Sequence, residues 1–333
     1  SFSPENAEYL ETNDRPTVPL RAEAAKVLAV RQGVYLGASR RAYLSELQGE
    51  PRMEEGIMTG HADSPEPDPV RTGVGTSEVM PQDRPASPFS VFVRAARFSF
   101  GDKLLFDGLD LALAGGRWTC LLGPSGVGKS TLLRLILGLE GPLGEGGAVE
   151  CSDGLPLAGR AAFMAQRDLL FPWLSVIDNL TLGSRLRGGR PARRDGEGRA
   201  RGLLSRVGLA ENAGDLPESL SGGMRQRTAL ARTLMEDRPV VLMDEPFSSL
   251  DAITRLRQQN LAVELLEGCT VLLVTHDPLE ALRLGHRIHI LSGRPARLDD
   301  ALLPGGVPPR DVAQPGLLEM QGDLLKHLAA ASA

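Results

Sequence analysis

The stretch Gly123-Pro-Ser-Gly-Val-Gly-Lys129-Ser130-Thr131 decides how this chain folds, because it matches the phosphate-binding pattern G-x-x-x-x-G-K-[ST] in full. An apolar run, Trp118 to Leu122, precedes it and predicts a strand, and an apolar helical pattern follows it. Glycines let backbone N–H groups close around phosphate oxygens, and a helix N-terminus adds a favourable field. The sequence therefore predicts a nucleotide-binding loop in which Lys129 reaches the β and γ phosphates and Ser130 ligates Mg²⁺.

Outward from this loop, short apolar runs alternate with helical patterns. The runs 91–93, 118–122, 240–243 and 271–274 predict strands, the last two of the buried parallel type. Helical patterns cover residues 130–137, 224–235, 252–266 and 279–284. A last helix is expected to pack its apolar side on the same domain through Leu317, Leu318, Leu324, Leu325 and Leu328. Strands that alternate with helices predict an α/β fold with a mainly parallel central sheet.

Composition and charge exclude several classes of protein. The chain has 333 residues, of which 42% are hydrophobic and 24% are charged, so wholesale disorder and fibrous structure are excluded. A net charge of -5 argues against binding nucleic acid over a broad basic surface. No run approaches the roughly 20 apolar residues that cross a bilayer, and no basic region with an apolar core begins the chain. A soluble protein that is not exported is therefore expected.

Cysteine usage points to a reducing environment. The three cysteines, Cys120, Cys151 and Cys269, lie far apart in the chain and show no C-x-x-C spacing. This pattern argues against a disulfide framework and against a zinc site, and it favours the cytoplasm.

The chain divides into three parts. Residues 1–48 carry the spacing of one or two short amphipathic helices and have no assigned role. Residues 49–88 are rich in proline and acidic residues, which predicts a disordered linker. The acidity is concentrated in residues 1–88, with 14 Asp and Glu against 9 Lys and Arg, whereas the remainder balances 28 against 28. Residues 89–333 are expected to form the folded domain, the last helix included.

A second element of the site ends the apolar run 240–243, where two carboxylates, Asp244 and Glu245, follow directly. At the carboxyl end of a buried strand they would face the nucleotide, with Asp244 in the Mg²⁺ shell and Glu245 polarising a water. Alone, an apolar run that ends in an acidic turn is a weak signal. Together with the phosphate-binding loop, it predicts nucleotide hydrolysis.

The segment Leu220-Ser221-Gly222-Gly223-Met224-Arg-Gln-Arg closely resembles the signature motif of the ABC-transporter ATPases. A serine and two glycines open the predicted helix, so Ser221 and free backbone N–H groups form a second anion site. In that family, this site serves the nucleotide held by the other subunit. Met224 stands where many members have glutamine, which removes no phosphate contact.

Further elements of the family appear in order along the chain. Phe100 matches the aromatic residue that stacks on adenine, and Phe98 is a rival for that role. Gln166 matches the glutamine that senses Mg²⁺ and the attacking water. Ser248-Ser-Leu-Asp251 matches the loop that crosses the dimer interface, and a plain helix cap at Asp251 is the alternative. His276 matches the histidine that contacts the γ phosphate.

The resemblance implies a role for each of these residues. It assigns catalysis to Glu245, His276, Gln166 and Lys129, and metal binding to Ser130, Gln166 and Asp244. The nucleotide contacts that it implies are Phe100, Gly123, Pro124, Ser125, Gly126, Val127, Gly128, Lys129, Ser130, Thr131, Ser221, Gly222, Gly223 and Asp251.

The resemblance spans about residues 90–300 and implies an ABC cassette of the P-loop NTPase class, with an antiparallel β region and a helical signature subdomain beside the central sheet. It implies an ATPase that uses ATP and Mg²⁺ and forms a homodimer with two shared sites. The partners that it implies are an integral-membrane permease and, indirectly, a periplasmic or extracellular solute-binding protein. Its place would be peripheral, at the cytoplasmic face of the inner membrane.

Two stretches narrow the subgroup. Residues 170–180 and 293–296 are similar to the importer ATPases of the nitrate, sulfonate and taurine group, which includes thiamine-precursor uptake. The solute stays open, because specificity in such importers lies in other subunits.

Alternative functions lack the features they need. A DNA-repair or chromosome ATPase of the superfamily would carry a long insertion, and Gln166 and Ser221 lie too close in the chain to hold one. A translation factor of the family would have two phosphate-binding loops, an exporter would usually carry fused membrane helices, and a P-loop kinase has no use for the Ser221 motif.

A dense apolar cluster, Phe171, Pro172, Trp173 and Leu174, follows Gln166 where the chain should leave the site for the surface. One interpretation is core packing. The other is a surface that receives a short helix of the permease, so that movement near Gln166 on ATP binding reaches the membrane subunit.

Overall fold

The computed structural model describes residues 88–186 and 192–331. The helices predicted in residues 1–48, and the predicted linker up to residue 87, therefore lie outside the described residues. Among the helices that are described, none has the length and apolar character needed to span a bilayer.

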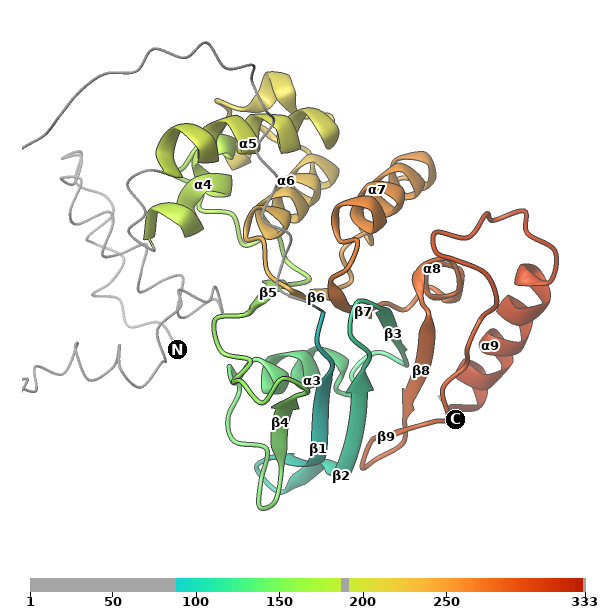
Figure 1. Ribbon diagram of the computed structural model, residues 1–333. Helices are drawn as coiled ribbons and strands as arrows, with labels where there is room; N and C mark the ends of the chain where they lie inside the picture. Colours follow the sequence, from blue (N-terminus) through green and yellow to red (C-terminus); the bar gives the residue numbers. More distant parts are fainter. Residues whose placement is uncertain (1–87, 187–191, 332–333) are drawn as a thin grey trace, which may run out of the picture. The chain divides into compact units, whose positions relative to one another are not determined.

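A small antiparallel sheet opens the described part (Figure 1). Its strands, in the order β2–β1–β4, are β2 (Lys103–Leu113), β1 (Val91–Phe100) and β4 (Ala148–Cys151). The strand predicted at 91–93 thus runs on to Phe100. The register with β2 is irregular between Val93 and Ser99, and this breaks the alternation of buried and exposed residues. The sequence pattern therefore predicted only the first part of the strand.

The larger sheet is the predicted, mainly parallel one. Its strand order is β5 (Ala161–Met164), β6 (Val240–Asp244), β7 (Thr270–Val274), β3 (Trp118–Leu122), β8 (Arg287–Ser292) and β9 (Arg297–Leu298). All neighbouring pairs are parallel except β8 and β9. Every residue of β3, β6 and β7 is buried, which explains their continuous apolar runs.

Seven helices are described: α3 (Lys129–Ile136), α4 (Val176–Leu186), α5 (Ala192–Arg206), α6 (Gly222–Met235), α7 (Ala252–Leu265), α8 (Pro278–Leu284) and α9 (Leu317–Ala331). Short 3-10 turns at Ala210–Asn212 and Pro217–Ser219 lead into α6. Helices α4, α5 and α6 pack on one another, as Figure 1 shows, and form the predicted helical subdomain. Ser221, Asp251 and Asp277 cap α6, α7 and α8 with their side chains.

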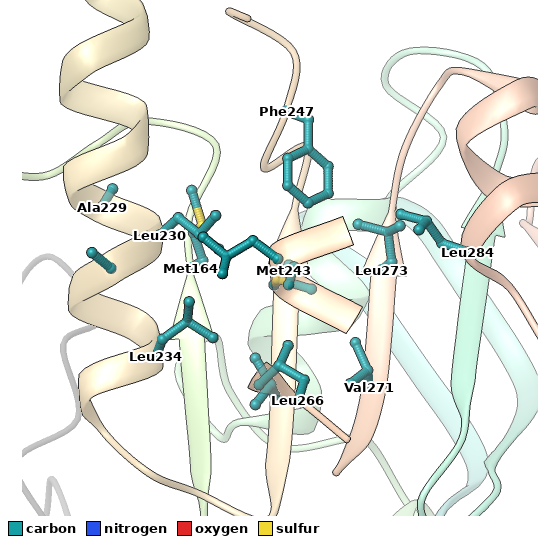
Figure 2. Close-up of a cluster of buried hydrophobic side chains, with 14 of the residues drawn as sticks. Met164, Ala229, Leu230, Leu234, Met243, Phe247, Leu266, Val271, Leu273 and Leu284 are labelled. Carbon is teal, nitrogen blue, oxygen red and sulfur yellow. The ribbon is translucent and has the colours of Figure 1, made fainter. Parts of the chain in front are cut away.

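Two apolar cores cover the two faces of the parallel sheet, because successive residues of a strand point to opposite faces. Val240 and Leu242 of β6 face a core that includes Leu132 of α3 and the inner side of the small sheet. Val241 and Met243 face the core built by the later helices. Figure 2 shows part of this second core, where Met164, Leu230 and Met243 lie among the labelled side chains.

The three cysteines are free and buried. Burial raises the pKa of the Cys269 thiol to about 11 and also raises the pKa values of the Cys120 and Cys151 thiols. They are therefore apolar packing residues.

Helix α9 packs against α8, as expected for the last helix, but with a narrower contact face than the sequence suggested. Leu317 and Leu324 are buried and Leu328 is partly buried, whereas Leu318 is 70% exposed and Leu325 is 50% exposed. At 3.6 residues per turn, each of the last two is rotated about 100° from its buried neighbour. The prediction that all five leucines pack on the domain is therefore wrong for Leu318 and Leu325.

Candidate functional site

The loop between β3 and α3 carries the predicted phosphate-binding residues, and its backbone tolerates only glycine at two places. Gly123 has φ +156°, and a Cβ there would lie 2.4 Å from the carbonyl oxygen of Leu291. Gly128 has φ +112°, and a Cβ there would lie 2.9 Å from the Phe106 ring. The tight loop therefore brings the backbone N–H groups at the start of α3 together without side chains in the way.

Lys129 is buried at the first position of α3 and folds back over this loop. Its ammonium donates hydrogen bonds to the carbonyl oxygens of Gly123, at 2.7 Å, and Pro124, at 2.9 Å. Burial lowers the pKa of the ammonium, and the nearby carboxylates of Glu245 and Asp244 oppose that shift. The side chain is thus a buried cation above the loop that is matched to an anionic ligand.

Ser130 and Asp244 lie together beside Lys129. Asp244, the last residue of β6, is buried, and its carboxylate accepts a hydrogen bond from the Ser130 hydroxyl. Burial raises the pKa of the carboxyl group, and this hydrogen bond and the Lys129 charge oppose the rise. Two oxygen ligands of the kind that Mg²⁺ prefers therefore meet next to the phosphate loop.

Glu245 follows Asp244 and is held between two other predicted site residues. Its Oε2 accepts a hydrogen bond of 3.1 Å from the Gln166 side-chain amide, and its Oε1 lies 3.1 Å from Nδ1 of His276. The three residues come from the carboxyl ends of β5, β6 and β7, which are adjacent and parallel, so strand order brings them together. The Glu245 backbone has φ +48°, and its N–H bonds the carbonyl of Val274, which fixes the side chain toward this edge.

Ser221 lies on the exposed rim at the start of α6, and its hydroxyl accepts a hydrogen bond of 3.3 Å from the Met224 N–H. The N–H groups of Gly222 and Gly223 belong to the first turn, where no helical carbonyl can accept from them. A cavity of about 350 Å³ lies between this turn and the segment that carries Gln166. The start of α6 is thus accessible for an anion supplied from outside the chain.

Asp251 caps the N-terminus of α7, as the alternative interpretation from the sequence predicted. Its carboxylate accepts a hydrogen bond from the Thr254 N–H at 3.0 Å, and this lowers the pKa of the Asp251 carboxyl group. The Asp251 side chain is still exposed, so it caps the helix and is also accessible to a partner.

The two candidate adenine-stacking residues differ in accessibility. Phe98 packs against the core beneath the small sheet, whereas Phe100 is 51% exposed at the end of β1. The two rings meet edge to face with centroids 5.0 Å apart. Phe100 is therefore the one with a free face for a base.

Sequence reasoning missed the residues that hold the Gln166 segment in place. Arg225 on α6 bonds the Asp168 carboxylate at 3.1 Å, and Arg232, two turns later, donates to the carbonyls of Asp168 and Leu169 at 2.7 Å each. Burial lowers the pKa of Arg232 to about 10. The only available signal was the i, i+7 spacing of two arginines on one helix face.

Comparison with known proteins places these features in one family. Residues 106–248 match the model of the ABC transporter family. The chain is 43% identical over 241 residues to an uncharacterized ABC transporter ATP-binding protein of Haemophilus influenzae, covering 72% of this chain and 98% of the relative. It is 42% identical over 250 residues to the aliphatic sulfonates import ATP-binding protein SsuB of Delftia acidovorans, covering 74% of this chain and 97% of the relative.

A solved structure agrees with these relatives. The dimeric post-hydrolysis state of the ATP-binding cassette MJ0796, bound to ADP and Pi, matches with a TM-score of 0.58 and 29% identity. The match covers 65% of this chain and 100% of the cassette. The α/β cassette fold expected from the motifs is thereby confirmed.

Proposed function

The chain belongs to the ATP-binding proteins of ABC transporters, and from this premise we propose that it energises uptake of a solute of the sulfonate group through a separate permease. Relatives about 40% identical carry the name aliphatic sulfonates import ATP-binding protein, which supports the importer type and this solute group. The solute within the group is set by the permease and by a solute-binding protein outside the cytoplasm, with the chain at the cytoplasmic face of the membrane.

The observation that carries hydrolysis is the placement of Glu245 between Gln166 and His276. Glu245 orients the attacking water or accepts its proton, and the two neighbours hold its carboxylate on the phosphate side of β6. Lys129, Gln166 and His276 stabilise the charge on the transferring phosphoryl group. Phe100 stacks on the adenine ring, and residues 123–131 wrap the phosphates.

Mg²⁺ fits the oxygen ligands beside the loop. The Ser130 hydroxyl and the Asp244 carboxylate meet there, and Gln166 approaches from β5. These three residues would hold the ion, which supplies charge neutralisation for the β and γ phosphates when bound. Burial raises the pKa of the Asp244 carboxyl group, and a cation bound beside it would lower that pKa again.

Each active site is shared by two chains. The exposed start of α6, with Ser221, Gly222 and Gly223, has N–H groups for the γ phosphate of an ATP held by a second copy. Asp251, the last residue of the loop 248–251, lies at the contact between the copies. The dimeric state of the similar cassette MJ0796 supports this arrangement.

Residues 89–333 are the ATPase domain, and residues 1–48 with the linker 49–88 form an extension outside it. None of the residues assigned to ATP or to its hydrolysis lies in the extension. Nucleic acid is not a partner, in keeping with the net charge of -5.

The shared site is tested by mixing two inactive variants, Lys129→Ala and Ser221→Arg. In the mixed dimer, one site has an intact phosphate loop from one chain and an intact Ser221 from the other, while the second site carries both defects. We expect the mixture to recover ATP turnover that neither parent shows, with exchange of subunits followed by differently tagged chains. A mixture no more active than its parents, once exchange is demonstrated, contradicts shared sites.

A further inference from the structure

Gln226 joins the start of α6 to the loop that carries Glu245. Its side-chain amide nitrogen donates a hydrogen bond of 3.0 Å to the carbonyl oxygen of Glu245, and its Oε1 accepts one of 2.8 Å from the N–H of Ser249. The side chain is 5% exposed. Both ends of one buried amide are therefore used on the loop 245–249, with no water needed to complete the pairs.

Backbone packing reinforces this contact. A Cβ at Gly223, one turn before Gln226, would lie 3.5 Å from the Leu250 side chain and 3.7 Å from the Ser249 carbonyl oxygen, so the first turn of α6 rests directly on the loop. Leu250 is itself buried. A helix is stiff over one turn, so displacement of the loop is passed to Ser221 and its anion-binding turn.

The position of Gln226 matters because its two neighbours serve different ATP molecules in the proposed dimer. Glu245 acts on the ATP bound by its own chain, whereas Ser221 contacts the ATP bound by the other chain. We propose that Gln226 is a positioning residue that couples the two ATP sites, by holding the loop 245–249 and the start of α6 in one fixed arrangement. This inference rests on the shared sites proposed above.

The amide is needed for both bonds at once. Methionine at this position fills a similar volume but cannot donate to the Glu245 carbonyl, and its sulfur is only a weak acceptor for the Ser249 N–H. The Glu245 carbonyl keeps a hydrogen bond of 3.1 Å from the Ser248 hydroxyl, so the substitution removes the link to α6 without unpairing that carbonyl. Glutamate keeps the acceptor for Ser249 but, when ionised, places an oxygen against the Glu245 carbonyl. The two substitutions therefore remove two bonds and one bond respectively.

The test uses the mixture that has a single intact site. That site consists of the phosphate loop of the Ser221→Arg chain and the Ser221 turn of the Lys129→Ala chain. Gln226→Met is introduced first into one chain and then into the other. We expect turnover at saturating ATP to fall about ten-fold or more in both placements. The KM for ATP should change by less than about two-fold, because the phosphate loop, residues 123–131, is unchanged in the chain that binds the ATP.

Gln258→Met is the matched control, because Gln258 is a helical glutamine that is also 5% exposed and its Oε1 accepts no hydrogen bond within the described residues. It should leave turnover unchanged. An equal fall with Gln258→Met, a fall in only one placement of Gln226→Met, or no fall overturns the coupling. If Gln226→Met does not fold, Gln226→Glu is used in both placements and the same pair of falls is expected. The mixture without a Gln226 substitution reports on the shared sites alone. If it is inactive although exchange is proven, the shared sites are contradicted and the coupling fails with them. If it is active and Gln226→Met has no effect, only the coupling fails.

Discussion

The side-chain amide of Gln166 donates to Oε2 of Glu245 over 3.1 Å although 79 residues separate the two in the chain. Gln166 lies two residues beyond β5, and Glu245 lies directly after β6, its neighbour in the sheet. Asp168 and Leu169, two and three residues beyond Gln166, are in turn bound by Arg225 and Arg232 of α6. The segment 166–169 thus contacts both the Glu245 carboxylate and the helical subdomain.

Glu245→Gln tests the catalytic carboxylate. The amide keeps the shape and hydrogen-bonding reach of the side chain but cannot accept a proton from water, so turnover should fall by at least about 100-fold while ATP still binds. Steady-state phosphate release and nucleotide binding are measured on the same preparation. Near-normal turnover would place the catalytic base elsewhere.

Lys129→Ala should weaken ATP binding itself. Among the described residues, the direct hydrogen-bond partners of the ammonium are the neutral carbonyls of Gly123 and Pro124, so its charge-assisted contact with phosphate is lost without replacement. A fall of at least about ten-fold in affinity is expected from titration with a fluorescent ATP analogue, corresponding to a charged hydrogen bond of roughly 1.5–3 kcal/mol. Unchanged affinity would show that the ammonium has no part in binding.

Much of the candidate site could be predicted because its residues stand at fixed distances from buried strands. The strand 118–122 is apolar except for Thr119, and the runs 240–243 and 271–274 are apolar throughout. Parallel strands end at a common edge, so Lys129, Glu245 and His276 could be placed together from sequence. The structure adds that Phe100, and not Phe98, has the accessible ring.

The rest could not be predicted because it depends on tertiary contacts. In the sequence, Gln226 is an ordinary polar residue of a predicted helix. Only the folded chain shows that its side-chain amide forms hydrogen bonds with the backbone of Glu245 and Ser249. The split of the α9 leucines into buried and exposed ones depends on where α8 lies, and helical periodicity alone does not fix that position.

Deleting residues 1–88 should leave ATP binding and thermal stability nearly unchanged, because the deletion removes no residue of the site or the described core. A deletion through Ser90 is the comparison. It also removes Phe89, which is buried, lies under the Arg160 guanidinium at 3.8 Å and accepts a hydrogen bond from Thr270. Burial of an aromatic side chain is worth roughly 1.5–3 kcal/mol, so the melting midpoint should fall by about 3–12 °C in that variant alone. A fall of this size on deleting only residues 1–88 would show that the extension docks on the domain.

The apolar cluster after Gln166 is divided by the fold into a core part and a surface part. Phe171 is buried, whereas Trp173 is 41% exposed and meets the Phe171 ring with centroids 5.6 Å apart. Asn179 of α4 holds the loop between them, since it accepts from the Phe171 N–H and donates to the carbonyls of Phe171 and Leu174. Core packing is therefore the correct interpretation for Phe171, and Trp173 is presented outward on a loop fixed at its base.

Trp173→Ala tests whether this presented ring is the contact with the permease. An exposed aromatic residue on a rigid loop, a few residues from Gln166, is suited to bind an apolar helix and to pass on movement of the Gln166 segment. In a reconstituted transporter, Trp173→Ala should reduce ATP-driven transport and permease association by at least about ten-fold, the effect of losing a contact of roughly 2 kcal/mol, while the isolated subunit keeps its melting midpoint and ATP affinity. Phe171→Ala is the matched comparison, and it should lower the melting midpoint of the isolated subunit, because it removes a buried ring. Loss of stability with Trp173→Ala would assign that residue to the core as well, and intact transport would place the coupling surface elsewhere.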